Sequence, residues 1–358
     1  MITISLCMIV KNEELNLANC LNSIKDVVDE IIIVDTGSTD KTKEIAKDFT
    51  DKIYDFEWIY DFSAARNFSF SKATCEYIMW LDADDIVLKN DCVKLKDIKE
   101  NLDTKYNAIS MVYDLGFYGD SNEQIQFKRN RLLKRSRNYK WLGFIHEYIC
   151  VTGNTYESDV HITHTKNHGS SRNLDIYQKK IKEGCKLSIR DTFYYGKELF
   201  HNGFHDEAIE VLNNVINSQD SSIEQKFDSI HSVCDIYFYK NMIRNGREIL
   251  SKAFDLAPLR GETLYRFAFS YQLESRFEIA ISWYEIIDSI SKPSLLLGGF
   301  VYNKYYTWLP HVQLCVCYYA IGNIEKSKYH NDIAFKMNPN NKYSIANNKF
   351  FKITKRTV

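Results

Sequence analysis

An apolar run that ends in three carboxylates is the feature of this chain that most restricts its fold. Residues 77–81 read Tyr-Ile-Met-Trp-Leu, which is typical of a strand buried on both faces. Asp82, Asp84 and Asp85 follow at once. In a parallel α/β sheet, ligands bind beyond the carboxyl ends of the strands, so these side chains are expected at a ligand site. Clustered carboxylate oxygens favour a divalent cation such as Mg²⁺ or Mn²⁺.

The segments before this run predict a parallel sheet. Residues 1–10 and 30–34 are further apolar stretches that read as buried strands. Residues 17–24 place apolar side chains at helical spacing between them, and a second helix is expected to end near Lys47. Strands that alternate with helices imply βαβ crossovers, and therefore parallel neighbours in one sheet.

Five short motifs carry a resemblance to a known family. Four follow one another within the first 85 residues, at Ile9–Glu13, Val34–Asp40, Phe62–Asn67 and Leu81–Asp85. In this order they resemble the motifs of the family 2 glycosyltransferases, whose catalytic domain has the GT-A fold. The fifth motif, Trp141–Glu147, is similar to the branch of that family with helical repeats behind the catalytic domain. That branch includes the sublancin-type peptide S-glycosyltransferases.

The resemblance and the residue pattern together predict two domains. An α/β GT-A domain is expected over residues 1–170, a connecting helix over 171–190, and an all-α domain of tetratricopeptide-like (TPR-like) repeats over 191–358. Gly196 and Ala208 show the small-residue spacing at which paired helices of such repeats cross. Three further degenerate units follow, with an insertion near residues 291–308, although an irregular helical domain is the alternative. The positions that recur in those units are Cys234, Tyr237, Gly246, Leu250, Ala253, Pro258, Ala268, Tyr271, Ala280, Tyr284, Cys315, Tyr318, Ser327, Ala334 and Pro339.

The resemblance also implies roles at the donor site. Asp35 would hydrogen-bond the nucleotide base, or it would merely stabilise its own turn. Arg66 would face the base or the phosphates, the alternative being a solvent-exposed helix cation. Asp82 would lie near the ribose, and Asp84 would contact the metal and so assist catalysis. The nucleotide-sugar contacts implied in full are Val10, Asn12, Asp35, Arg66, Asp82, Arg131 and His146.

A basic stretch at residues 128–137 holds six cations in ten residues. Such a run raises the question of nucleic acid. With 46 basic and 47 acidic residues, however, the chain has no net cationic field to attract a polyanion. The stretch is therefore either a solvated hairpin face or a contributor near the donor phosphates. Arg131 is singled out because the related branch has an arginine shortly before its His-Glu motif.

The His146-Glu147 pair follows the aromatic residues Tyr139 and Trp141. An inverting transfer needs a base that removes the acceptor proton, and Glu147 is the candidate. His146 would contact the diphosphate or orient the loop. The alternative is a His-Glu pair that only fixes the loop, and a thiol acceptor would need less help from a base.

Three histidines, His161, His164 and His168, follow within eight residues. Strand alternation places His161 and His164 on opposite faces, so a zinc cage is not favoured. In metal-dependent GT-A enzymes a late histidine often completes the cation site, and the resemblance points to His164, with His168 as the alternate. A purely structural histidine is the competing interpretation.

Composition places limits on location. The nine cysteines are odd in number and scattered, so they predict no disulfide framework and favour a reduced, cytoplasmic compartment. The first ten residues lack the basic region and cleavage site of a signal peptide. No apolar stretch reaches 18 residues, so an integral membrane segment is not expected.

The expected activity is the transfer of a hexose from a nucleotide sugar, with UDP-glucose as the guess from the family, to a polypeptide Cys, Ser or Thr side chain, with Mn²⁺ or Mg²⁺ and with inversion. One alternative acceptor is a glycan or lipid-linked sugar of a cell-surface polysaccharide. A different class is a non-catalytic scaffold whose repeats bind a partner. Dimerisation through the repeats is a further expectation. The sequence does not distinguish sulfur from oxygen as the acceptor atom.

Overall fold

The computed structural model describes residues 1–118, 123–165, 172–256, 259–292 and 302–354. The chain divides into two compact units. The main parts of the first are Met1–Gly116 and Gln124–Gly169, and those of the second are Ser170–Ser294 and Val301–Val358. Each unit is described by itself.

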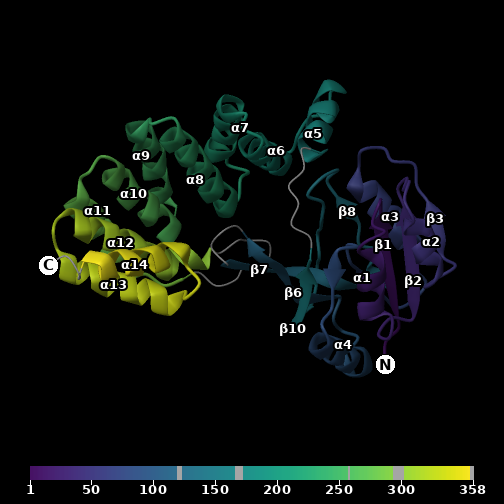
Figure 1. The fold of residues 1–358 in the computed structure, drawn as a ribbon. Helices are drawn as coiled ribbons and strands as arrows, with labels where there is room; N and C mark the ends of the chain where they lie inside the picture. Colours follow the sequence, from purple (N-terminus) through teal and green to yellow (C-terminus); the bar gives the residue numbers. More distant parts are fainter. Residues whose placement is uncertain (119–122, 166–171, 257–258, 293–301, 355–358) are drawn as a thin grey trace. The chain divides into compact units, whose positions relative to one another are not determined.

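The first unit is built around an eight-stranded mixed sheet with the order β3-β2-β1-β4-β7-β6-β10-β5 (Figure 1). β1 pairs in parallel with β2 and β4, and β2 with β3, so the predicted βαβ crossovers are present. β4 pairs antiparallel with β7, and β8 and β9 form a separate two-stranded sheet. The strands are β1 (Ile4–Val10), β2 (Glu30–Asp35), β3 (Ile53–Asp55), β4 (Tyr77–Trp80), β5 (Asp85–Ile86), β6 (Ala108–Tyr118), β7 (Glu123–Lys134), β8 (Trp141–Leu142), β9 (Tyr148–Ile149) and β10 (Thr155–His164).

Four helices pack on this sheet: α1 (Leu17–Ile24), α2 (Thr42–Lys47), α3 (Phe62–Ser71) and α4 (Lys89–Asn101). The apolar residues of α1 that fall at helical spacing are all buried, as the sequence predicts. α1 contacts α2 and α4, whereas α3 packs against β1, β2 and β8. α3 begins where the Asp61 carboxylate accepts the backbone N–H of Ala64 at 2.9 Å. This cap fixes the start of the helix that carries Arg66.

From residue 172 onward, the regular elements that the structure describes in the second unit are helices. It contains α5 (Arg172–Lys182), α6 (Ile189–His201), α7 (His205–Asn217), α8 (Ile223–Tyr239), α9 (Ile243–Ser251), α10 (Gly261–Leu273), α11 (Phe277–Ile287), α12 (Trp308–Ala320), α13 (Ile324–Met337) and α14 (Lys342–Thr354). Consecutive helices from α6 to α13 contact each other in pairs, which Figure 1 shows as a succession of stacked hairpins. Ser188 and Ser222 form capping boxes that begin α6 and α8. The predicted domain of helical repeats is confirmed.

Small residues allow the paired helices to approach closely. A Cβ added to Gly196 in α6 would lie 2.5 Å from Leu212 in α7, and one added to Gly246 would lie 2.3 Å from Phe238. Ala208 is fully buried at the same helix crossing as Gly196. The small residues that the sequence singles out are therefore required by packing.

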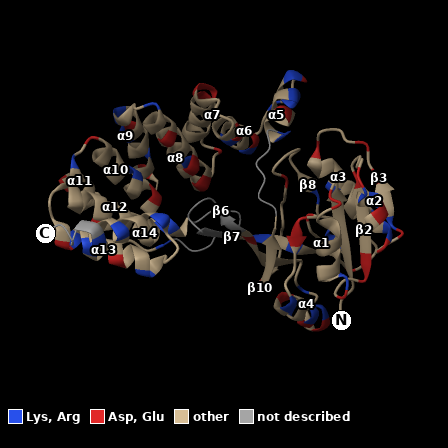
Figure 2. Ribbon diagram, viewed as in Figure 1, with Lys and Arg blue, Asp and Glu red and all other residues tan. Residues whose placement is uncertain are grey.

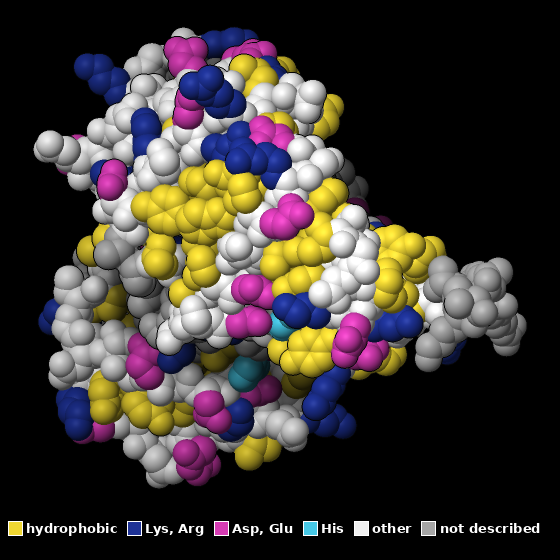
Figure 3. Space-filling view, turned by 90° about the vertical axis from the view of Figure 1, so that its left-hand side faces the viewer, with side chains coloured by type: hydrophobic (Ala, Val, Ile, Leu, Met, Phe, Trp, Pro, Cys, Tyr) yellow, Lys and Arg dark blue, Asp and Glu magenta, His cyan; other side chains and the backbone are white. Residues whose placement is uncertain are grey.

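The surface of the helical unit mixes charged and apolar side chains. Figure 2 shows Lys and Arg interspersed with Asp and Glu along its helices, and Figure 3 shows hydrophobic side chains gathered between charged ones on one face. Tyr319, Tyr329 and Tyr343 in the last three helices are each between 44% and 61% exposed. No helix in the described ranges is long and apolar enough to span a bilayer. All nine cysteines are described, and each is a free thiol.

Candidate functional site

Asp35 lies at the carboxyl end of β2, directly opposite Val10 of β1. Its Oδ1 accepts the backbone N–H groups of Gly37 and Ser38 at 3.0 and 2.9 Å, so it does stabilise its own turn. Its Oδ2 is buried and has no hydrogen-bond partner among the described residues. A buried carboxylate oxygen without a donor is costly, so this atom is a ready acceptor for a ligand N–H or O–H.

Two loops meet beside Asp35. Asn12, in the left-handed region at φ 54, accepts the N–H of Thr39 at 2.8 Å and donates its own N–H to Ser38 Oγ at 2.9 Å. The carbonyl of Val10 accepts the N–H of Thr36 at 2.9 Å. Val10 and Asn12 therefore lie next to Asp35, and the contacts shown for them hold the loops together.

Arg66 joins two predicted site residues that are distant in the sequence. Its Nη2 donates to Asp82 Oδ1 at 2.7 Å and its Nε donates to Glu147 Oε1 at 2.6 Å. The guanidinium lies beside the Trp80 and Trp141 rings, 5.1 and 4.8 Å from their centres. The side chain is only 8% exposed, so it is not the solvent-exposed cation of the alternative interpretation.

These charges shift one another's ionisation. Burial alone would lower the pKa of Arg66, but the carboxylates of Asp82 and Glu147 raise it above its usual range. Burial alone would raise the pKa of Asp82, but Arg66 and then Arg131 hold it far below its usual range. Arg66 and Asp82 therefore stay charged near neutral pH.

The loop that carries His146 and Glu147 connects β8 to β9. Asn67, in α3, anchors β8 because its side chain accepts the Trp141 N–H at 2.9 Å and donates to the Trp141 carbonyl at 3.0 Å. His146 is half-buried with φ 48, a backbone conformation that fixes the direction of the next residue. The Glu147 side chain is 12% exposed, and the structure shows no hydrogen bond to its Oε2 within the described residues.

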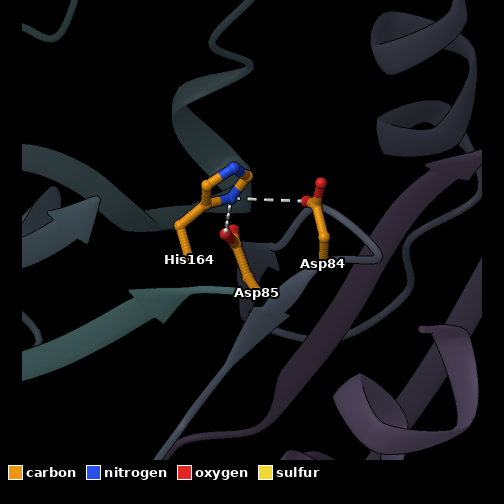
Figure 4. Close-up of side chains that lie close together, drawn as sticks. All are labelled: Asp84, Asp85 and His164. Carbon is orange, nitrogen blue, oxygen red and sulfur yellow. Dashed lines mark hydrogen bonds and ion pairs between the residues drawn. The ribbon is translucent and has the colours of Figure 1, made fainter. Parts of the chain in front are cut away.

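A candidate metal centre lies at the end of β4. Among the described residues, Asp84, Asp85 and His164 form a group whose ligand atoms all lie within 4.8 Å of one another. Antiparallel pairing of β5 with β10 sets His164 opposite Asp85. His164 Nδ1 is 3.5 Å from Asp84 Oδ1 and 3.3 Å from Asp85 Oδ1 (Figure 4).

Asp85 differs from the other two members because the protein already satisfies it. It is fully buried, its Oδ1 accepts the Tyr113 hydroxyl at 2.8 Å, and its Oδ2 accepts the Asp82 N–H at 3.1 Å and pairs with Arg131 Nη1 at 3.1 Å. The side chains of Asp84 and His164 are 17% and 21% exposed and remain accessible. The Nε2 of His164 points away from Asp85 in Figure 4. Asp84 and His164 thus offer a carboxylate and an imidazole that suit a divalent cation, with Asp85 hydrogen-bonded to the imidazole.

The pKa values of the two accessible members shift in the same direction. Burial raises the pKa of Asp84 to about 6; Asp82 and Asp85 add to the rise, and His164 opposes it. Burial alone would lower the pKa of His164, but the hydrogen bond to Asp85 and the charge of Asp84 raise it. A cation would displace these protons, because metal ligands bind in their deprotonated forms.

Not every predicted residue reaches the accessible part of this site. Arg131 is 0% exposed, and its contacts are with Asp85 and with the Trp80 ring, whose centre is 3.8 Å from the guanidinium carbon. His161 faces away and pairs with Asp114 at 2.7 Å. His168 lies outside the described residues. Sequence reasoning assigned no role to Asp85 in orienting His164, since that role depends on the register of β5 with β10.

Comparison with known proteins gives a consistent result. Residues 5–162 match the family model for Glycosyl transferase family 2. An uncharacterized glycosyltransferase of Rickettsia bellii (strain RML369-C) is 34% identical over 220 residues, which cover 60% of this chain and 73% of that protein. The SPbeta prophage-derived glycosyltransferase SunS of Bacillus subtilis (strain 168) is 28% identical over 254 residues, which cover 67% of this chain and 60% of SunS. The chain thus spans less than two thirds of the length of SunS.

Among solved structures, the chain is similar to S. aureus TarS 1–349 in complex with UDP-GlcNAc, at 12% identity and a TM-score of 0.37 over 92% of this chain and 90% of that one. A TM-score this low carries no argument about function. The family match and the sheet order confirm the predicted GT-A fold class for the first unit. The family match and the similarity to the Rickettsia bellii protein show that the chain belongs to the family 2 glycosyltransferases.

Proposed function

We propose that this glycosyltransferase moves a hexose, with UDP-glucose as the first donor to test, to a Cys, Ser or Thr side chain of a polypeptide, with inversion and with Mn²⁺ or Mg²⁺. The observation that carries the proposal is the link through Arg66 between Asp82, at the end of β4, and Glu147. One guanidinium thus contacts both the carboxylate expected beside the donor and the candidate base. Such an arrangement suits a displacement at a single reaction centre.

The donor nucleotide would bind across the ends of β1 and β2. Asp35 Oδ2 offers a buried acceptor that could receive an N–H of the base. Val10 and Asn12 form the adjacent wall through their loop contacts. Uridine as the base rests on the family resemblance.

The metal would be held by Asp84 and His164, whose accessible ligand atoms fit it. When bound, a divalent cation neutralises negative charge that develops on the departing diphosphate. Asp85 holds His164 in place through Nδ1, and Tyr113 supports both because its hydroxyl lies 2.8 Å from Asp85 and 3.0 Å from His164. Oxygen and imidazole donors suit Mn²⁺, and Mg²⁺ would rely more on Asp84.

Glu147 would act as the base. Its Oε1 is held by Arg66, and its Oε2 is available to accept the proton of the acceptor hydroxyl or thiol. Attack from the face opposite the diphosphate would invert the anomeric carbon. A thiol acceptor ionises more easily than a hydroxyl, so Glu147 would then chiefly position it.

A polypeptide acceptor is supported by the helical repeats and by the resemblance to the sublancin-type peptide S-glycosyltransferases. A solenoid of helix pairs presents an extended surface that suits an unfolded segment. The free cysteines and the absence of a spanning helix in the described ranges agree with an encounter in the cytoplasm.

The test is an assay of the purified protein with a panel of nucleotide sugars, with Mn²⁺, Mg²⁺ or a chelator. The panel would be combined with a library of unstructured peptides that contain Cys, Ser and Thr. A metal-dependent mass increase of one hexose on a peptide would support the proposal. Transfer only to oligosaccharide or lipid-linked acceptors would indicate a role in cell-surface polysaccharide synthesis instead. Absence of donor hydrolysis and of transfer under all conditions would favour a non-catalytic scaffold.

A further inference from the structure

The three arginines of the site differ in whether they contact a carboxylate directly. Arg66 is shared by Asp82 and Glu147, and Arg131 is paired with Asp85. Arg129, in β7, makes no hydrogen bond and no ion pair within the part of the chain that the structure describes. The N–H donors of Arg129 therefore contact no carboxylate directly within the described residues.

Its position on β7 brings it to the carboxyl end of β4. β4 and β7 pair antiparallel, with Tyr77 opposite Lys134 and Met79 opposite Leu132. The same register, continued beyond the last pair, sets residue 129 level with residue 82. The charge of Arg129 also contributes to the low pKa of Asp82, which is consistent with this closeness.

Aromatic rings fix the direction of the side chain. The guanidinium carbon of Arg129 lies 5.1 Å from the Phe127 ring centre, 5.2 Å from that of Tyr113 and 5.7 Å from that of Trp80. The residue is half-buried, so its side chain is not free in solvent. Contacts of this kind with aromatic rings use no N–H donor of the guanidinium and leave these donors for another group.

The surrounding charges indicate what that group is. Asp82, Asp84 and Asp85 lie at the same strand end, and together they would repel an anionic donor. The planar guanidinium fork of Arg129 suits an anion with several oxygens, which describes a phosphate better than a neutral sugar, and its positive charge would offset this repulsion. A cation at Asp84 and His164 would offset only part of this charge.

We propose that Arg129 binds the diphosphate of the nucleotide-sugar donor and stabilises it as the leaving group. The inference rests on the proposed function, because it takes the donor to be a nucleotide sugar. The contact with the donor phosphates that was expected of Arg131 is thus assigned to Arg129, which lies on the same face of β7. Arg131 is fully buried, whereas Arg129, two residues earlier in the same strand, is half-buried.

The experiment measures binding and needs no turnover. Wild type, Arg129→Met and Arg129→Lys are titrated calorimetrically with UDP, GDP, ADP, CDP and dTDP, in the presence and absence of Mn²⁺. The matching nucleoside is followed by saturation-transfer NMR. Lys128→Met is the control, since Lys128 is adjacent in the sequence but pairs with Glu157. Thermal melting first establishes that each variant is folded.

Arg129→Met should bind the preferred diphosphate with a dissociation constant 10- to 100-fold larger than that of wild type. This change corresponds to about 1.4 to 2.7 kcal/mol, the size of one lost charge-assisted contact. Nucleoside binding should be unchanged, Arg129→Lys should recover part of the loss, and Lys128→Met should behave as wild type. Equal diphosphate affinity in wild type and a folded Arg129→Met would overturn the inference, since Arg129 would then be a solvated cation. Equal loss for nucleoside and diphosphate would also overturn it. If wild type binds none of the five diphosphates, the proposed function fails together with the inference.

Discussion

Arg66 Nε donates to Glu147 Oε1 at 2.6 Å, although the two residues are 81 positions apart in the chain. The contact joins α3 to the loop between β8 and β9, and the same guanidinium reaches Asp82 on the other side. The candidate base is thus held by the group that also holds Asp82, the carboxylate proposed to lie beside the donor. A substitution of either carboxylate should therefore change the position of the other, because both contact Arg66.

Replacement of Asp84 tests the metal-assisted departure of the diphosphate. Asp84→Asn should lower sugar transfer by about 100-fold or more, because a neutral amide holds a divalent cation less well and leaves the developing charge unbalanced. Initial rates at several Mn²⁺ concentrations measure the effect. Asp159→Asn is the control, since Asp159 is 84% exposed. Near-normal turnover and metal dependence in Asp84→Asn would show that Asp84 is not a ligand.

His164 and His161 provide a matched pair on one strand. His164→Ala should weaken Mn²⁺ binding by about 10- to 100-fold or more, whereas His161→Ala should leave it unchanged because His161 pairs with Asp114. Electron paramagnetic resonance of free Mn²⁺ gives both dissociation constants without any substrate. An equal loss in the two variants would point to a general disturbance of β10, and no loss in either would remove His164 from the ligand set.

Replacement of Glu147 separates proton transfer from binding. Glu147→Gln keeps the shape of the side chain but cannot accept a proton, so turnover should fall about 10²- to 10⁴-fold with the donor dissociation constant nearly unchanged. Single-turnover rates and donor titration measure the two quantities. Glu157→Gln, at a 54% exposed side chain, is the control. If donor binding falls as much as turnover, Glu147 is a binding or structural residue.

Glu30 predicts a pH dependence of stability away from the site. The residue is only 7% exposed, and Ser5, Lys52 and Thr74 donate hydrogen bonds to its carboxylate. Burial alone would raise its pKa, but these donors lower it to about 2 from an ordinary 4.5. Because the folded pKa is depressed, the stabilisation is present above pH 4.5 and is lost as the pH falls toward 2. Its size is about 3 kcal/mol.

Urea denaturation of wild type and Glu30→Gln from pH 7 to pH 2.5 isolates this contribution. The free energy of unfolding of the variant should be lower at pH 7, and the difference should shrink as the solution is acidified. A difference that stays constant with pH would mean that Glu30 acts through packing and not through its charge.

The close helix crossing at Gly196 predicts a steric effect in the repeats. Gly196→Val should destabilise the protein by about 1–3 kcal/mol, because the new side chain would overlap Leu212, which is fully buried and has no room to move. Thermal and urea unfolding measure the loss. Glu210→Val, on the exposed face of α7, is the control for the β-branched residue itself. Equal stability of Gly196→Val and wild type would argue against a tight crossing.

Much of the fold could be predicted because the pattern of apolar residues follows the geometry of the elements. Strand-end positions such as Asp35 and Asp82 were predictable, since parallel strands bring their carboxyl ends to one edge. The small residues of the repeats were predictable for a similar reason, since close crossings accept little else. The predicted domain limits and the roles of the site residues stay predictions.

Side-chain contacts were not predictable in the same way. The contact of His164 with Asp85 depends on the register of two strands 79 residues apart, which no local pattern specifies. Strand alternation assigns Arg129 and Arg131 to the same face of β7, so the sequence does not tell which of the two is more deeply buried. Arg66 was predicted to contact the donor, but its two carboxylate partners come from separate elements.

The sealed pair of Arg131 and Asp85 has an evolutionary consequence. Both side chains are 0% exposed, and loss of either partner would leave an uncompensated buried charge, at a cost of about 3–5 kcal/mol. Single changes at either position would therefore be removed by selection before a compensating change could arise. Across related chains, positions 85 and 131 should either be retained together or be replaced together by a neutral pair. The two positions are therefore expected to covary.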